Sequence, residues 1–154
     1  MVSKGDMAPD FEVLDHMGNK FRLSSERGKI VVLYFYPKAM TSGCTQEGLR
    51  FNALLPEFQK LGAVVYGIST DSVEDNRKFA EIQGFNFRLL CDVGGNVARA
   101  YGVFKGVMGT GMADRVTFVI DENGKIAEVL RGIRPAERHA DEALRVVKEL
   151  RGAK

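Results

Sequence analysis

Cysteine is scarce in this chain, and the positions of its two cysteines exclude several classes of protein. Only Cys44 and Cys91 occur among 154 residues. Two cysteines are too few for a disulfide-stabilised scaffold, and their separation fits neither a C-x-x-C redox motif nor a zinc site. Reactive thiol chemistry in a reducing compartment fits them better. The alternative for each is a small apolar residue packed in the core.

Long apolar runs and a strong net charge are also missing. No stretch approaches the roughly eighteen apolar residues of a membrane helix, and residues 1–6 lack the apolar segment of a signal peptide. The formal net charge of +2 is too small to predict binding to nucleic acid or to an anionic membrane. We therefore expect a cytoplasmic protein without a nucleic-acid or membrane partner.

The composition predicts one folded unit. Hydrophobic residues make up 45% of the chain and charged residues 27%, which is ordinary for a globular protein. No internal repeat or long linker divides the sequence, so we expect residues 1–154 to form a single domain. The glycine-rich segment 104–114 does not lead from a strand into a long helix, so it predicts no nucleotide or other cofactor. We expect it to form a mobile, apolar rim of a pocket.

Hydrophobic patterns predict an α/β fold. Two short strands around a turn at Gly18 form an N-terminal hairpin, and continuous apolar runs mark buried strands further on. The predicted strands are 11–15, 20–23, 30–36, 63–68, 87–91, 116–120 and 126–130. Helices are predicted after Cys44, over 73–83 and 96–101, and at the C-terminal end. The first helix contains Pro56, where we expect a kink or a restart. The result is a mixed central sheet with helices on both faces.

The eight residues from Pro37 to Cys44 are the most informative about function. They directly follow the buried strand 30–36 and directly precede a helical pattern, so Cys44 lies in the first turn of a helix. Backbone N–H groups are unpaired there, and the helix dipole is equivalent to about half a positive charge. That field stabilises a cysteine thiolate, and the position predicts that Cys44 is a nucleophile.

The same segment resembles the active-site signature of the peroxiredoxins, P-x-x-x-[T/S]-x-x-C, with Pro37, Thr41 and Cys44 in matching positions. Residues 44–47, Cys-Thr-Gln-Glu, resemble the C-T-x-E continuation of the Q-type, or bacterioferritin-comigratory, branch. Residues 115–121 resemble the later arginine strand of that family. The resemblance covers residues 4–150 and implies a thioredoxin-like fold with the N-terminal β-hairpin of the peroxiredoxins.

The resemblance also implies an activity, that of a thiol-dependent peroxidase for hydrogen peroxide and small organic hydroperoxides. Cys44 would attack a peroxide oxygen and become a sulfenic acid. Thr41, Arg115 and the backbone N–H groups of Gly43 and Cys44 would hold the peroxide oxygens. Pro37 would help to exclude water from the thiolate. No metal, haem or flavin is implied.

Glu47 has two interpretations that the sequence leaves open. It matches the acidic residue of the Q-type branch and could orient Arg115 through a charged hydrogen bond. Its position in the first turn of a helix also suits simple complementarity with the helix dipole. The two histidines, His16 and His139, have no metal-ligand or catalytic spacing, and we expect both on the surface.

The second cysteine decides how the sulfenic acid is reduced. Many Q-type members carry a resolving cysteine five residues after the first, and Leu49 occupies that position here. Cys91 ends a strand that a thioredoxin-like order places two strands from the one before Cys44. That separation is about 10 Å, whereas bridged cysteines need Cα atoms within about 7 Å. We therefore expect a one-cysteine cycle in which an external thiol, either a thioredoxin-like protein or a small thiol, reduces Cys44.

Alternatives to this cycle remain at this stage. Cys91 could resolve Cys44 if the helix around Cys44 unwinds after oxidation. A protein of a different class, a redox-inert or chaperone-like binding protein on the same fold, is also compatible with the fold alone. A dithiol oxidoreductase is excluded because C-x-x-C is absent. The resemblance to Q-type members suggests a monomer or a weak dimer.

Overall fold

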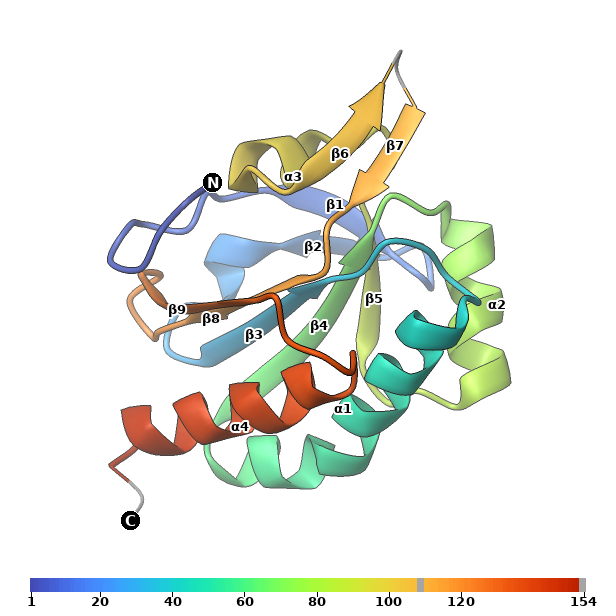
Figure 1. The fold of residues 1–154 in the computed structure, drawn as a ribbon. Coiled ribbons are helices and arrows are strands. Elements are labelled where there is room, and N and C mark those ends of the chain that lie inside the picture. The colour runs from blue at the N-terminus through green and yellow to red at the C-terminus, as the bar shows by residue number, and fades with distance from the viewer. Residues whose placement is uncertain (108–109, 153–154) are drawn as a thin grey trace.

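The structure is a computed structural model that describes residues 1–107 and 110–152, and in these residues a seven-stranded mixed sheet forms its centre (Figure 1). The strand order is β2-β1-β5-β4-β3-β8-β9. The strands are β1 (Glu12–Asp15), β2 (Lys20–Arg22), β3 (Ile30–Phe35), β4 (Ala63–Ser69), β5 (Arg88–Cys91), β8 (Val116–Ile120) and β9 (Ile126–Arg131). The neighbours β3, β4 and β5 are parallel, and the other pairings are antiparallel. The predicted mixed sheet and N-terminal hairpin are confirmed.

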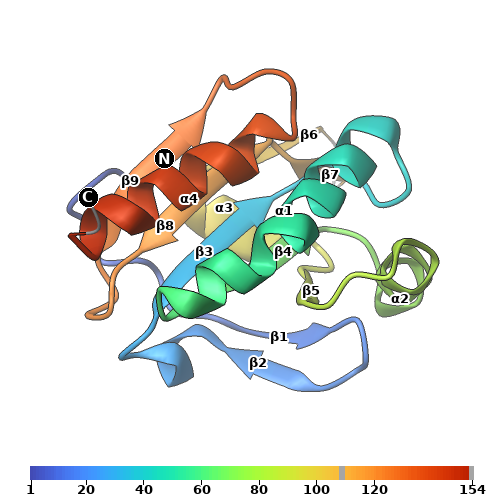
Figure 2. The ribbon, with the colours of Figure 1, turned by 90° about the horizontal axis from the view of Figure 1, so that it is seen from below.

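Helices cover both faces of this sheet. They are α1 (Ser42–Lys60), α2 (Val73–Gln83), α3 (Asn96–Tyr101) and α4 (Arg138–Leu150), with a 3-10 turn at Leu23–Glu26. α1 and α4 pack together on one face, where α2 shares their core layer, and α3 lies on the opposite face (Figures 1 and 2). None of the helices in the described ranges has the length and apolar character needed to cross a membrane.

β3 is the buried central strand that the sequence predicts. All six of its residues are buried, and alternate side chains enter the two core layers. Tyr34 points toward α1 and stacks on Phe51 with ring centroids 4.3 Å apart, whereas Phe35 points to the layer beneath α3. Burial on both faces fixes the position of the strand, and with it the start of the loop that leads into α1.

Pro56 does not divide the first helix. α1 is continuous from Ser42 to Lys60, although Pro56 has no N–H group to donate. Leu55 and Phe58 flank the proline and are buried in the core, and this burial offsets the missing hydrogen bond. Of the two outcomes expected at Pro56, the helix does not restart. Its axis bends instead, as Figure 1 shows.

The segment after α3 forms a hairpin that is not among the predicted strands. β6 (Phe104–Val107) pairs antiparallel with β7 (Thr110–Ala113), and the two project from the body of the molecule (Figure 1). Phe104 is covered by the Arg99 guanidinium, which lies 4.1 Å from the ring centroid. Residues 108 and 109, part of the expected mobile rim, lie outside the described residues.

Candidate active site

The loop from β3 to α1 holds the predicted active-site segment. Pro37 follows the strand and is half-buried, and the Ala39 N–H group donates to Asp71 Oδ2 at 2.8 Å, which ties the loop to the segment before α2. Met40 has a φ of +71°, a left-handed conformation that costs energy for a residue with a side chain. This turn directs the chain into Thr41, whose extended backbone is the N-cap of α1.

Thr41 sits at the mouth of the site with its hydroxyl engaged. The hydroxyl donates to the Lys38 carbonyl at 2.7 Å, so its oxygen is left to accept a hydrogen bond from a bound molecule. The side chain makes no capping hydrogen bond; instead, the Thr41 carbonyl accepts from the Thr45 N–H group at 2.9 Å. That is the first hydrogen bond of the helix, so the N–H groups of Gly43 and Cys44 precede the helical ladder and are free to bind an anion.

Arg115 reaches Cys44 because of the sheet register. It directly precedes β8, and β8 pairs with β3 so that Val116 lies opposite Phe35. The Arg115 side chain therefore extends over the start of α1, where Nη2 donates to Cys44 Sγ at 3.5 Å. Cys44 is only 1% exposed. The guanidinium is thus placed as a hydrogen-bond donor to a buried sulfur.

Glycine at position 43 allows this close approach. A Cβ atom on Gly43 would lie 3.0 Å from Arg115 Nη2 and 3.9 Å from the Ala136 side chain. Arg115 directly precedes β8 and Ala136 lies just before α4, so the starts of β8 and α4 crowd the first turn of α1 here. The small residue thus gives the guanidinium room beside Cys44.

Glu47 lies one turn along α1 from Cys44 and is completely buried. Its Oε1 accepts a charged hydrogen bond from Arg115 Nη1, which is the contact that the first of the two sequence interpretations requires. Burial raises the pKa of Glu47 to about 8, and the positive charge of Arg115 opposes this shift. The carboxyl group can therefore exchange a proton near neutral pH.

His139 is a component of the site that the sequence analysis placed wrongly on the surface. It is the second residue of α4 and is 1% exposed, because α4 packs this side against α1 and β8. Its Nδ1 lies 3.0 Å from Thr117 Oγ1 and 4.0 Å from Glu47 Oε2. Burial, assisted by the charge of Arg115, lowers the pKa of His139 to about 4, so the ring is neutral at pH 7.

A pattern in the sequence could have located His139. It stands four residues before Ala143, and Val147 follows four residues later, so all three share the buried face of α4. His16 also differs from the expectation, because it is half-buried and its Nδ1 accepts from the Leu89 N–H group at 3.1 Å. In both cases the tertiary neighbours, which are remote in sequence, decide the burial.

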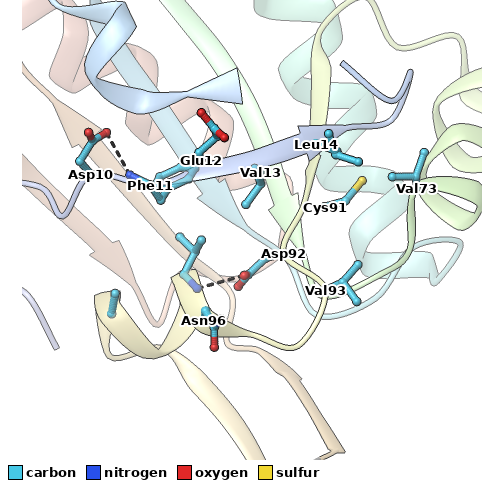
Figure 3. Close-up of a pocket in the computed structure, with 12 residues that line it drawn as sticks. Asp10, Phe11, Glu12, Val13, Leu14, Val73, Cys91, Asp92, Val93 and Asn96 are labelled. Atoms are coloured by element: carbon cyan, nitrogen blue, oxygen red, sulfur yellow. Dashed lines mark hydrogen bonds between the residues drawn. The ribbon is translucent and has the colours of Figure 1, made fainter. Parts of the chain in front are cut away.

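Cys91 lies elsewhere on the sheet. It ends β5, two strands from β3 in the sheet order, as the sequence predicts. Asn76 Nδ2 donates to its sulfur at 3.4 Å, and burial raises the pKa of the Cys91 thiol. Its side chain lines a groove of about 460 Å³ between β1 and α3 (Figure 3). The groove is lined by Asp10, Phe11, Glu12, Val13, Leu14, Val73, Cys91, Asp92, Val93, Asn96, Val97 and Ala100, and so by none of the residues around Cys44.

Comparisons with known proteins agree with this geometry. Residues 4–129 match the AhpC/TSA family. A Mycobacterium tuberculosis protein named as a peroxiredoxin is 43% identical over 152 residues, which cover 97% of this chain and 99% of that protein. The crystal structure of peroxidoxin BcpB from M. tuberculosis has a TM-score of 0.93 and 41% identity, over 97% of this chain and 99% of the other. The bacterioferritin comigratory protein of Xanthomonas campestris has a TM-score of 0.84 and 36% identity, over 92% of each chain.

The fold and site together define a class of protein: a thioredoxin-like fold with a cysteine in the first turn of a helix and an arginine against its sulfur. The chain belongs to the AhpC/TSA family, the peroxiredoxins, and is similar to the Q-type, or bacterioferritin-comigratory, members of that family. It is a thiol-dependent peroxidase, as predicted from the sequence.

Proposed function

We propose that Cys44 is the peroxidatic residue and that the structure's Arg115 contact is what equips it for the reaction. The thiolate attacks one peroxide oxygen, the O–O bond breaks, and the bonding electrons leave with the second oxygen. That oxygen takes a proton and departs as water or an alcohol, while Cys44 becomes a sulfenic acid. The observation that supports this proposal is the hydrogen bond from Arg115 Nη2 to Cys44 Sγ, 3.5 Å long, at the start of α1.

The remaining predicted residues have complementary roles in this proposal. The free N–H groups of Gly43 and Cys44 stabilise the negative charge that develops on the departing oxygen, as does Arg115. Thr41 Oγ1, whose proton is held by the Lys38 carbonyl, accepts the hydrogen bond of the peroxide O–H group. Pro37 holds the loop without adding a backbone donor that would attract water.

Hydrogen peroxide and small organic hydroperoxides are the proposed substrates. The X. campestris relative, which is 36% identical to this chain, has been described for its alkyl peroxide reduction activity. This similarity supports an organic hydroperoxide as a substrate here. Met40 flanks the site and is half-exposed, so it offers apolar contact to the organic part of a hydroperoxide.

An external thiol is the proposed reductant. The first thiol molecule displaces water from the Cys44 sulfenic acid and forms a mixed disulfide; the second attacks that disulfide and releases the Cys44 thiol. Cys91 is poorly suited to replace the external thiol, because burial raises its pKa and keeps it protonated. A thiol-reduced cycle suits the reducing, cytoplasmic compartment expected from the sequence.

Trapping the intermediate tests this assignment. The parent protein and Cys44→Ser are each treated with one equivalent of peroxide in the presence of a dimedone-type sulfenic-acid reagent, and the adduct is located by mass spectrometry. We expect one adduct on Cys44 in the parent and no peroxide consumption by the variant. An unlabelled Cys44, or peroxide consumption by C44S at the parent rate, would contradict the assignment. A redox-inert binding protein predicts an unlabelled Cys44.

A further inference from the structure

The Glu47 carboxyl group has one oxygen bound and one oxygen unpartnered. Oε1 accepts from Arg115, whereas Oε2 is buried and has no hydrogen-bond partner among the described residues. Leaving a charged oxygen unpaired in a buried site is costly. His139 Nδ1 lies 4.0 Å from Oε2. A proton on Oε2 would remove the cost of leaving a charged oxygen unpaired there.

Four groups from four segments surround the Glu47 carboxyl group. Arg115 precedes β8 and carries the only charge among them that does not depend on pH. Cys44 lies on α1 and is anionic when reactive. Tyr34 on β3 keeps its proton, because burial raises its pKa, and its hydroxyl is likewise buried without a partner among the described residues. His139 on α4 is neutral at pH 7.

Ionised Cys44 and ionised Glu47 would compete for the positive charge of Arg115. If Cys44 and Glu47 are both ionised, the buried cluster carries a net charge of −1, and one guanidinium is shared between two anions. If Glu47 holds a proton, the cluster is neutral and the charge of Arg115 acts on the sulfur. Arg115 contacts both groups, so a proton on Glu47 leaves the positive charge of the guanidinium to the sulfur. The reactive state is therefore favoured by whatever stabilises protonated Glu47.

His139 is placed to provide that stabilisation. The Thr117 hydroxyl, buried on β8, lies 3.0 Å from Nδ1 and is its hydrogen-bond partner. An unprotonated ring nitrogen has one lone pair, so Nδ1 accepts from Glu47 only when the Thr117 hydroxyl turns its proton away. A proton on Oε2 can be directed at Nδ1 once the two atoms approach by about 1 Å. An apolar residue at position 139 would offer no partner.

We propose that His139 is a positioning residue for the peroxide reaction: it accepts the hydrogen bond of protonated Glu47 and so leaves the charge of Arg115 to Cys44 and the departing oxygen. The proposal rests on the proposed function, because it requires Cys44 to be the nucleophile. His139 does not itself contact the sulfur or the peroxide. It acts through Glu47 and Arg115.

A matched pair of substitutions tests the proposal. Asn and Leu are similar in shape, and Asn can place a polar atom near the position of Nδ1, whereas Leu cannot. We expect His139→Leu to slow peroxide-dependent oxidation of Cys44 about tenfold, the effect of losing one hydrogen bond to a charged network. His139→Asn should stay within about threefold of the parent rate. Equal slowing in both variants would assign His139 a packing role and overturn the proposal.

The dependence on Glu47 is tested in a second background. Glu47→Met has no carboxyl group to position, so adding His139→Leu to it should change its rate by less than about twofold. A full tenfold loss in that background would show that His139 acts independently of Glu47. Should H139L fail to fold, His139→Met takes its place as the variant without a comparable acceptor: it should be slower than the parent, and at alkaline pH, where Glu47 loses its proton, this rate difference should disappear. A difference that does not vary with pH would overturn the proposal.

The same experiments separate this proposal from the proposed function. Formation of the Cys44 sulfenic acid is followed in the parent protein in every run. If the parent forms none, the nucleophile assignment fails. If the parent forms it normally and the variants behave alike, only the role of His139 fails.

Discussion

A hydrogen bond between Arg115 and the buried Glu47 carboxyl group fixes which part of the guanidinium faces the Cys44 sulfur. Nη1 donates to the carboxyl group, and this leaves Nη2 directed at Cys44 Sγ, 3.5 Å away. A guanidinium is planar and presents several donors in a rigid fork, so one side chain can serve both partners. An ammonium group is a single point charge on a flexible stem and cannot hold the same geometry.

Replacing Arg115 by Lys or Met should therefore slow the oxidation of Cys44 by about a hundredfold. The loss should exceed the fall in thiolate fraction, because the guanidinium also stabilises charge on the departing oxygen. Stopped-flow kinetics gives the rate, and the ultraviolet absorbance of the thiolate gives its fraction in the same variant. A rate that falls only in proportion to that fraction would restrict Arg115 to ionising Cys44.

Gly43→Ala tests the space beside the guanidinium. The added Cβ would lie 3.0 Å from Arg115 Nη2, and this end of the side chain can shift without unfolding the protein. We expect an unfolding transition close to that of the parent and a peroxide rate about tenfold lower, because small displacements of a catalytic group are costly. Gly48→Ala is the contrasting control: its Cβ would lie 2.3 Å from the Phe85 ring, so it should lower stability. An unchanged rate in G43A would show that the position of Nη2 is not critical.

Local signals account for what the sequence predicted well. Ser72 is followed by the helix over 73–83, and its side chain accepts from the Asp75 N–H group. Gly84 closes that helix with a φ of +71°. The start of α1 is equally local, since strand, loop and helix follow one another directly around Cys44. Such features depend on neighbours within a few residues, and a single sequence contains them.

Relationships between distant segments account for what was missed. His139 is buried because α4 packs against α1 and β8, and nothing near it in sequence reports Glu47 or Thr117 as neighbours. The hairpin β6–β7 is rich in glycine, which is unfavourable in strands, so the strand signal in its sequence is weak. One of these glycines, Gly111, is required by close approach: a Cβ there would lie 2.4 Å from the Lys105 carbonyl oxygen on the facing strand.

The buried histidine should make stability depend on pH in the acid range. The pKa of His139 is lowered from about 6.5 to about 4 by burial and by Arg115. Between these values the unfolded chain binds a proton that the folded chain does not, so the free energy of unfolding falls as the pH drops from 6.5 to 4. Above pH 6.5 the effect is absent.

His139→Asn isolates this contribution, because Asn does not titrate. From pH 7 to pH 4 the variant should lose about 2–3 kcal/mol less stability than the parent in urea unfolding. Glu47 acts with the opposite sign, since its raised pKa makes the folded state the stronger proton binder up to about pH 8. That contribution is common to both proteins and cancels in the comparison. Parallel pH profiles would show that His139 titrates normally in the folded state.

Cys91→Ser should retain most of the peroxidase turnover. Cys91 ends β5, two strands from β3, and its sulfur accepts a hydrogen bond from Asn76, which also contacts the Tyr36 hydroxyl. These contacts belong to the buried layer beneath α2. Reaching Cys44 would require Cys91 to leave them, and Cys44 to leave Arg115 and the start of α1.

Two measurements check the role of Cys91 separately. Turnover with a small thiol such as dithiothreitol should remain within about twofold of the parent in C91S, since a serine hydroxyl fits the same buried site. Mass spectrometry after one equivalent of peroxide, without added thiol, should show Cys44 as sulfenic acid and Cys91 as a thiol in the parent. Rapid and stoichiometric loss of two hydrogens with a Cys44–Cys91 disulfide, together with loss of turnover in C91S, would establish the two-cysteine cycle. That outcome would mean that α1 unwinds at its first turn during each cycle, because only such local unfolding removes the separation that the sheet order imposes.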